Sequence, residues 1–363
     1  MWSLPSPKDS QQSREYSESI DLSDLTRRLE LNSSDSGSSR LSFSAREFVK
    51  VLTQLRIPGL LMPSHLRKET EIAQGRQFTV HRCEAALINN DVVRWNLAEV
   101  AVKRCRVENE AQDSFDLTSV RFQKQVHDMY LEVCALGNRA LRQHRNIVEL
   151  LGWAPDTSST AMPLLIMELA MGNLVHLLSH LDSDSDEWNV KHHVCLDISA
   201  GLDAIHQTGI VHADFKPRNI LIFETSTSQV KYIAKLADFG FSVTELDDTS
   251  ARVVPSAGFT EVWEAPEIRR CRTAGEKLTA QDYFKADNYS LGLVVWSSIC
   301  FRGDAPPVDD NIARSIEAMR SIPEGFSRLI IHAIQSVLCP EPCDRPTTVA
   351  GLFRDESDAC QAW

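Results

Sequence analysis

The stretch "HADFKPRN" (His212 to Asn219) places a histidine, an aspartate, a lysine and an asparagine between two patterned segments. Before it, "WNVKHHVCLDISAGLDAIHQTG" repeats apolar residues every three or four positions, which predicts a helix that ends near Gly209. After it, "ILIF" and "VKYIAKLA" have the composition of short strands and lead to "ADFG" (Ala237 to Gly240). The polar stretch is therefore predicted to be a loop between a helix and a pair of strands.

The chain of 363 residues divides by composition into a polar arm and one long patterned region. Residues 1–44 are rich in serine and acidic residues, and the run "LNSSDSGSSRLS" predicts a disordered arm that could serve a regulatory partner. Residues 45–69 are interpreted as a connecting segment and residues 70–355 as one folded domain. Residues 356–363 are interpreted as a short tail.

The first half of the domain is predicted to be rich in strands and the second half in helices. "VRFQKQVHDMYLEVCALGNRALRQ" (Val120 to Gln143) predicts a helix, and further helices are expected from about 284 to 354. One of them, "SLGLVVWSSICF" (Ser290 to Phe301), is apolar on all sides, as a buried helix is. Strand-like composition covers residues 78–87, 97–105 and 164–168. This order predicts an α+β fold of two lobes with a cleft between them.

Charge and cysteine content exclude several classes of function. The net charge is −12 and no basic stripe occurs, which argues against nucleic-acid binding. No apolar run is long enough to span a membrane, and we expect no signal peptide because no charged flank and apolar run open the sequence. The nine cysteines have no disulfide or zinc spacing, so we expect them to be reduced and the protein to be intracellular and cytoplasmic.

Five motifs occur in a fixed order along the domain: "VAVK", "LLIMELAMGNL", "HADFKPRN", "ADFG" and "FTEVWEAPE". Together they resemble the eukaryotic-type protein kinase superfamily, of the serine/threonine type. The tyrosine-kinase-like group is the one whose motifs are most similar to three stretches of this chain, "HRNIVELLGW", "DISAGLDAIH" and "WEAPE". The resemblance implies a two-lobed kinase fold, with a β-rich N-lobe at about 70–168 and a larger helical C-lobe at about 171–355. It also implies ATP and Mg²⁺ as cofactors and protein substrates.

The resemblance assigns an ATP site to the N-lobe and the segment that follows it. Lys103 of "VAVK" would hold the α- and β-phosphates, and Glu132 would be its partner, because Glu108 and Glu110 lie too near the strand. Met167 would stand behind the adenine, and the segment from Glu168 through Ala170 would follow the edge of its ring. Further residues expected to line the ATP site are Ile72, Gly75, Val80, Ala101 and Leu221.

The catalytic loop and the following motif would carry the chemistry. Asp214 would accept or orient the substrate hydroxyl proton, and Lys216 would steady the transferring phosphoryl group. Asn219 and Asp238 would bind Mg²⁺ through hard oxygen ligands. Phe239 and Gly240 then open the activation segment.

The activation segment ends in residues that the resemblance treats as structural. Thr260 would pack against the catalytic aspartate and lysine, and Glu267 would pair with Arg345 of "CDRPT". Asp287 of "DNYSLG" would cap the buried helix and brace the backbone of the catalytic loop.

The chain departs from the family pattern at two motifs. In "IAQGRQFTV" only the middle glycine, Gly75, remains, because Ala73 and Phe78 replace the first and third glycines. Glycines let the backbone close over phosphates, so their loss favours a pseudokinase or a nucleotide-binding scaffold. A third hypothesis is a kinase fold that phosphorylates a small molecule. Since Lys103, Glu132, Asp214, Lys216, Asn219 and Asp238 are all present, we favour an active kinase.

The second departure is Ala213, which stands where relatives carry an arginine that pairs with a phosphorylated activation segment. A methyl group cannot bind a phosphate, so activity is predicted not to require phosphorylation of this segment. An open alternative is that another basic residue substitutes for the arginine, with Arg252, Lys235 and Arg218 as the candidates.

Overall fold

The computed structural model divides into two units, residues 1–41 and 42–363, and everything described below belongs to the second. The structure describes the following residues: 45–59, 66–75, 77–85, 88–89, 92–93, 98–106, 120–156, 162–181, 187–225, 230–244, 260–307, 314–315 and 322–354. The serine-rich arm and the expected tail lie outside these residues.

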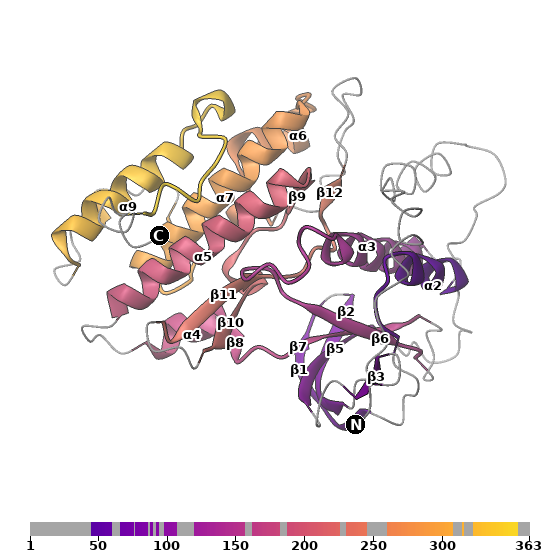
Figure 1. The fold of residues 1–363 in the computed structure, drawn as a ribbon. Helices are drawn as coiled ribbons and strands as arrows, with labels where there is room; N and C mark the ends of the chain where they lie inside the picture. Colours follow the sequence, from indigo (N-terminus) through magenta and orange to yellow (C-terminus); the bar gives the residue numbers. More distant parts are fainter. Residues whose placement is uncertain are drawn as a thin grey trace, which may run out of the picture. The chain divides into compact units, whose positions relative to one another are not determined.

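The first half of the described unit is built on an antiparallel sheet of five strands in the order β1-β2-β5-β7-β6 (Figure 1). These strands are β1 (Leu66–Gln74), β2 (Phe78–Ala85), β5 (Ala98–Cys105), β6 (Leu150–Ala154) and β7 (Leu164–Glu168). A small hairpin of β3 (Ile88–Asn89) and β4 (Val92–Val93) lies between β2 and β5 along the chain. The inner strands are held by a cluster that includes Cys83, Val100, Val102 and Ile166, all fully buried or nearly so.

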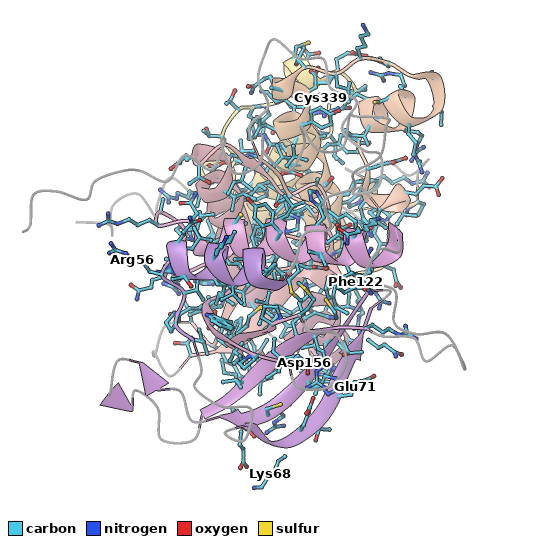
Figure 2. The ribbon with its side chains drawn as sticks, turned by 90° about the vertical axis from the view of Figure 1, so that its right-hand side faces the viewer. Arg56, Lys68, Glu71, Phe122, Asp156 and Cys339 are labelled. Carbon is cyan, nitrogen blue, oxygen red and sulfur yellow. The ribbon has the colours of Figure 1, made fainter. Side chains whose placement is uncertain are left out.

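Two helices belong to this half, α2 (Ala45–Gln54) and α3 (Val120–Gly137), and they contact each other. Figure 2 shows them next to each other, above the strands of the sheet. The helix α3 was predicted to continue to Gln143, but it ends at Gly137. The following turn is stabilised locally, since the Asn138 side chain accepts a hydrogen bond from Ala140 N at 2.9 Å.

The second half is mainly helical. Its helices are α4 (Leu174–His180), α5 (Glu187–Gln207), α6 (Pro266–Ala274), α7 (Ala280–Cys300) and α9 (Glu324–Val337). Short strands pair as β11-β10-β8 and as β12-β9. Their bounds are β8 (Gly172–Asn173), β9 (Ile210–Val211), β10 (Ile220–Glu224), β11 (Tyr232–Leu236) and β12 (Val243–Thr244).

The sequence prediction of an α+β fold with a strand-rich first lobe and a helical second lobe is confirmed. The helix α5 has the expected apolar face, with Val194, Ile198 and Leu202 buried, and Gly209 follows it with a φ of 76°. The apolar stretch from Ser290 onward lies in α7 and is buried almost throughout. In the part of the chain that the structure describes, no helix is long and apolar enough to cross a membrane.

Candidate active site

Four of the residues predicted to line a nucleotide site share one face of the five-stranded sheet. Ala101 and Lys103 are two positions apart on β5, and alternate residues of a strand point to the same face. Val80 of β2 is paired with Lys103, and Met167 of β7 is paired with Ala101. Opposed residues on neighbouring antiparallel strands face the same side, so the four side chains form one patch.

Lys103 joins two carboxylates that come from distant parts of the chain. Its Nζ donates to Glu132 Oε2 at 2.6 Å and to Asp238 Oδ1 at 2.9 Å. Glu132 projects from α3 and is 1 % exposed, whereas the Asp238 side chain, in the loop after β11, keeps 41 % of its surface exposed. The expected pairing of Lys103 with Glu132 is therefore formed, and Asp238 is left with a solvent-facing side.

Lys103 and its two carboxylate partners shift one another's pKa values. Burial alone would lower the pKa of Lys103, but Asp238 and Glu132 outweigh it and raise that pKa above its ordinary value. Lys103 therefore remains a cation at neutral pH. Partial burial would raise the pKa of Asp238, but the ammonium of Lys103 dominates and lowers it. Burial raises the pKa of Glu132, against the opposing charge of Lys103.

The turn between β1 and β2, where the glycine-rich motif was expected, is held by contacts with its neighbours. Gly75 N donates to Phe78 O at 2.8 Å, and Arg106 Nη1 donates to Gly75 O at 3.3 Å. Gln77 O accepts from Arg106 N at 2.8 Å and from the Gln125 side chain of α3 at 3.0 Å. These bonds, rather than the freedom of several glycines, fix the turn.

Phe78 places its ring on the lysine of the site. Lys103 Nζ lies 4.7 Å from the centroid of the Phe78 ring, which is a cation–π distance. Ile72 lies at an irregularity of the β1–β2 pairing, between Glu71 and Ala73, and is 49 % exposed. The first residue of the motif therefore faces solvent, while the residue in place of its third glycine covers Lys103.

The end of β7, at Glu168, is tied to both halves of the unit. Glu168 accepts two hydrogen bonds from Lys235 Nζ, at 2.7 and 2.8 Å, and one from Glu149 N at 2.7 Å. Ala170 is half-buried, and Leu221 lies on β10, where it pairs with Lys235 and Asn173. Since Lys235 is engaged by Glu168, it is a poor substitute for the missing arginine beside Asp214.

The catalytic-loop motif folds around Asp214, which is 2 % exposed. Asp214 Oδ2 accepts from Lys216 Nζ at 2.6 Å and from Asn219 Nδ2 at 2.9 Å. Asp214 Oδ1 accepts from the hydroxyl of Thr260 at 2.7 Å, and Lys216 Nζ also donates to that hydroxyl at 3.0 Å. The four side chains therefore form a closed network in which both oxygens of Asp214 have a fixed direction.

Comparison with known protein families identifies the family of the chain that carries this site. The protein kinase domain family matches residues 90–355, well over half of the chain. The chain is a member of the protein kinase family. The predicted superfamily is thus confirmed.

Several serine/threonine-protein kinases are similar to this kinase in sequence. The serine/threonine-protein kinase/endoribonuclease IRE1b of Arabidopsis thaliana is 35 % identical over 162 residues, covering 41 % of this chain and 16 % of that protein. PknB of Mycobacterium leprae (strain TN) is 26 % identical over 306 residues, covering 81 % and 43 %. CTR1 of Arabidopsis thaliana is 25 % identical over 299 residues, covering 80 % and 31 %. This kinase spans less than half the length of each of these relatives.

The backbone of the catalytic loop is held by a buried carboxylate of α7. Asp287 Oδ2 accepts from His212 N at 2.6 Å, and its Oδ1 accepts from Ala213 N at 3.0 Å. The sequence also predicted that Asp287 caps its helix, and that expectation is wrong. The helix begins seven residues earlier at Ala280, where Thr279 and Asp282 form a capping box.

Ala213 lies in an apolar environment. It is 1 % exposed, has a φ of 60°, and belongs to a buried cluster that includes Val211, Ala265 and Ile268. A methyl group among these apolar side chains offers no cation to a phosphate. Arg218, another candidate replacement for the arginine, is exposed, and Arg252 lies outside the described residues together with Glu108, Glu110, Thr249, Ser250 and Ser256.

Phe239 and Gly240 fix the start of the activation segment. Phe239 is fully buried, with its ring centroid 5.0 Å from that of His212, so it points away from solvent while the neighbouring Asp238 faces Lys103. Gly240 lies against α3, since a Cβ at this position would be 3.4 Å from the Cβ of Asp128. A Cβ at this position would make an ordinary van der Waals contact, so the space beside α3 does not itself require glycine.

Glu267 and Arg345 form the bidentate pair expected from the sequence. Arg345 Nη1 lies 2.5 Å from Glu267 Oε1, and Nη2 lies 2.9 Å from Oε2, with both side chains buried. Arg345 also donates to the carbonyls of Lys285 and Cys339, and its guanidinium stacks on the ring of Tyr289 at 4.8 Å. The pair joins α6 to the segment after α9, and its buried, bidentate geometry fits a structural role.

Two site residues on α3 were missed by sequence reasoning. Gln125 bonds the β1–β2 turn, and Asp128 lies one helical turn before Glu132. Asp128 is 4 % exposed and its Oδ2 has no hydrogen-bond partner among the described residues. Their spacing could have indicated them, because residues 125, 128 and 132 lie on one face of a helix that presents Glu132.

Proposed function

We propose that this protein kinase is an active, ATP- and Mg²⁺-dependent enzyme that phosphorylates serine and threonine residues of proteins. The observation that carries the proposal is the closed network of Asp214, Lys216, Asn219 and Thr260. A buried carboxylate with both oxygens held in place is preorganised to orient a hydroxyl group.

In the proposed reaction, Asp214 orients the substrate hydroxyl and takes up its proton. Lys216 has its ammonium beside Asp214 and Thr260, where it can neutralise charge on the transferring phosphoryl group. The oxygen–phosphorus bond forms at the substrate hydroxyl while the bond between the β- and γ-phosphates breaks. Positioning and charge account for most of the catalysis in such a transfer.

The nucleotide would lie on the sheet face around Lys103. Lys103 would pair with the α- and β-phosphates and would be held in place by Glu132, which is 2.6 Å away. The adenine would contact the apolar patch of Val80, Ala101 and Met167. Residues proposed to complete the adenine and phosphate contacts are Ile72, Gly75, Glu168, Ala170 and Leu221.

Asn219 and Asp238 fit the binding of Mg²⁺. Asn219 uses its amide nitrogen on Asp214, at 2.9 Å from both the backbone and a side-chain oxygen, which leaves its amide oxygen as a ligand. Asp238 offers a carboxylate that keeps a lowered pKa and partial exposure. When held by these two residues, Mg²⁺ would supply positive charge that neutralises the phosphates.

Specificity for serine and threonine is supported by two observations. Lys216 lies two residues after Asp214 and contacts the Thr260 hydroxyl, as the resemblance to serine/threonine kinases implies. In addition, IRE1b, PknB and CTR1 are all named serine/threonine-protein kinases.

A second candidate function is that of a nucleotide-binding scaffold without turnover. It is favoured by the cation–π contact of Phe78 with Lys103, which occupies one side of the ammonium that would hold the phosphates. An enzyme would need Phe78 to move when the nucleotide binds. The scaffold would bind Mg-ATP and leave it intact.

A phosphotransfer assay separates the two functions. Purified full-length protein is incubated with Mg²⁺, γ-labelled ATP and a general protein substrate such as casein, and the labelled amino acids are identified. The proposal expects label on serine or threonine. Binding of Mg-ATP without any transfer would support the scaffold, and label confined to tyrosine would overturn the specificity.

A further inference from the structure

The segment before the sheet, residues 45–59, is an ordered part of the folded unit although the family match begins only at residue 90. In α2, Phe48 and Leu52 are fully buried and Val51 is 5 % exposed, while Lys50 and Gln54 are exposed. Burial at positions i, i+3 and i+4 shows that α2 lays one apolar face on another element. A mere connection between an arm and a domain would not bury such a face.

The element that α2 covers is α3, the helix that carries Glu132. The two helices contact each other and lie side by side in Figures 1 and 2. Ten consecutive residues of α3, from 128 to 137, are buried. Successive residues of a helix point in directions about 100° apart, so ten buried residues require cover on every side. Because α3 contacts the sheet at β6, α2 supplies cover that the sheet cannot give.

Beyond α2 the chain fits closely against the end of α3. A Cβ on Gly137, the last residue of α3, would lie 2.9 Å from Leu55 Cδ1 and 3.4 Å from Ile57 Cδ1. Ile57 is itself 4 % exposed. In the turn after α3, Arg142 Nη2 donates to Leu55 O at 2.7 Å. The segment is thus fastened at the helix end by apolar packing and by a charged hydrogen bond.

The segment then joins the sheet edge at β6. Trp153 N donates to Pro58 O at 3.0 Å, and Gly59 forms a parallel bridge with Trp153. A Cβ on Gly152 would lie 2.7 Å from Pro58 O, and its three nearest atoms all belong to Pro58. One short segment therefore spans from the outer side of α3 to the edge strand of the same sheet.

We propose that residues 45–59 form a brace that positions Glu132 for its pairing with Lys103. The helix α3 is clamped between the sheet on one side and α2 on the other, and the brace is anchored to both α3 and β6. Loss of the brace would let α3 shift and break the 2.6 Å contact between Glu132 and Lys103. The effect on catalysis rests on the proposed function, whereas the effect on α3 does not.

The test combines brace variants with Glu132→Gln in the full-length protein. Phe48→Ala together with Leu52→Ala should lower kcat/KM by roughly 5- to 150-fold, the usual range for energetic coupling between sites. The matched control is Lys50→Ala, an exposed change on the same helix, which should leave kcat/KM unaltered. In the Glu132→Gln background the brace variant should have little further effect, because the contact it protects is already lost. Independent, multiplying effects would overturn the proposal.

Hydrogen exchange provides a readout that does not depend on activity. In the brace variant, the amides of residues 128–137 should lose protection, while those of α5 and α7 keep it. Unchanged protection of α3 would overturn the brace even if the protein has no kinase activity. Failure of the brace can therefore be distinguished from failure of the proposed function. If the double variant does not fold, Gly152→Ala serves instead, since it displaces Pro58 and leaves the apolar residues of α2 intact. It should produce the same selective loss of protection in α3.

Discussion

Lys103 and Asp238 are 135 residues apart in the sequence, and their side chains meet at 2.9 Å. Lys103 comes from β5 of the sheet, and Asp238 comes from the loop after β11 in the helical half. Because Glu132 binds the same ammonium, a single cation joins the sheet, α3 and the start of the activation segment. The position of each element is thus coupled to the other two at this point.

Changing Lys103 to Met should abolish phosphotransfer and also destabilise the fold. Removal of the lysine leaves Glu132 as a buried carboxylate without its partner, which costs about 3–5 kcal/mol. The double variant Lys103→Met with Glu132→Gln should recover much of this stability without regaining activity. Urea unfolding and a phosphotransfer assay on the same preparations check both parts. Full activity in either variant would contradict the assignment of Lys103.

Changing Phe78 to Gly should strengthen the binding of Mg-ATP. The ring lies over Lys103 Nζ, and a phosphate oxygen must compete with it for the third N–H of the ammonium. A cation–π contact contributes about 0.5 kcal/mol when it is exposed and about 2 kcal/mol when it is desolvated. The affinity for Mg-ATP should therefore rise by roughly 2- to 30-fold. Titration calorimetry measures the effect.

The control for this variant is Phe78→Leu, which keeps much of the bulk and removes the aromatic face. It should give an intermediate affinity. If Phe78→Gly instead weakens binding, the ring helps to hold the nucleotide and does not compete with it.

Changing Asp128 to Asn should stabilise the protein in a pH-dependent way. Burial raises the pKa of Asp128 from 3.8 to about 6, Asp238 acts in the same direction, and Lys124 and Lys103 oppose it. A carboxyl whose pKa is raised on folding adds stability below pH 3.8, and that stability is lost as the pH rises through 6. The ionisation of Asp128 should therefore lower the free energy of unfolding of the wild type by about 3 kcal/mol near pH 7.5 and by about 1 kcal/mol near pH 4.5.

Urea unfolding of wild type and Asp128→Asn at the two pH values checks this prediction. The asparagine keeps an acceptor for the side chain of Gln77, which hydrogen-bonds Asp128. The stability gain of the variant should shrink as the pH falls. A gain that is equal at both pH values would show that Asp128 does not titrate in this range.

Activity should not depend on phosphorylation of the activation segment. Ala213 stands in an apolar cluster, and its methyl group cannot pair with a phosphate as an arginine would. We predict that phosphatase treatment, and separately the combined change of Thr249, Ser250 and Ser256 to Ala, each leave most of the activity. Thr260 is kept because its hydroxyl binds Asp214. A large loss in both experiments would show that a phosphate switch survives without the arginine.

The linear motifs were enough to predict the fold and most of the contacts in the site. The strand Leu164–Glu168 and the bidentate pairing of Glu267 with Arg345 follow from local pattern and family order. The pairing of Lys103 with Glu132 could also be predicted, since only one glutamate of the expected helix stands at a suitable place.

Features that depend on packing between distant segments could not be predicted. Residues 45–59 belong to the segment 45–69 that was interpreted as a connection. Burial of Phe48 and Leu52 depends on the surface of α3 and leaves only a short apolar pattern in the sequence. The cap of α7 was misplaced because Asp287 is a good capping residue, yet it lies inside the helix and its carboxylate binds the catalytic loop. The contact of Phe78 with Lys103 depends on strand register, which the motif alone does not specify.

The most direct test of the central claim, that this kinase is catalytically active, is Asp214→Asn beside the wild type. The change keeps the size of the side chain and removes the charge at the centre of the network with Lys216, Asn219 and Thr260. Single-turnover transfer of labelled phosphate to a protein substrate should fall by about 10²- to 10⁴-fold, while Mg-ATP affinity changes little. Equal rates in the two proteins, or no transfer by the wild type while it binds Mg-ATP, would contradict the claim.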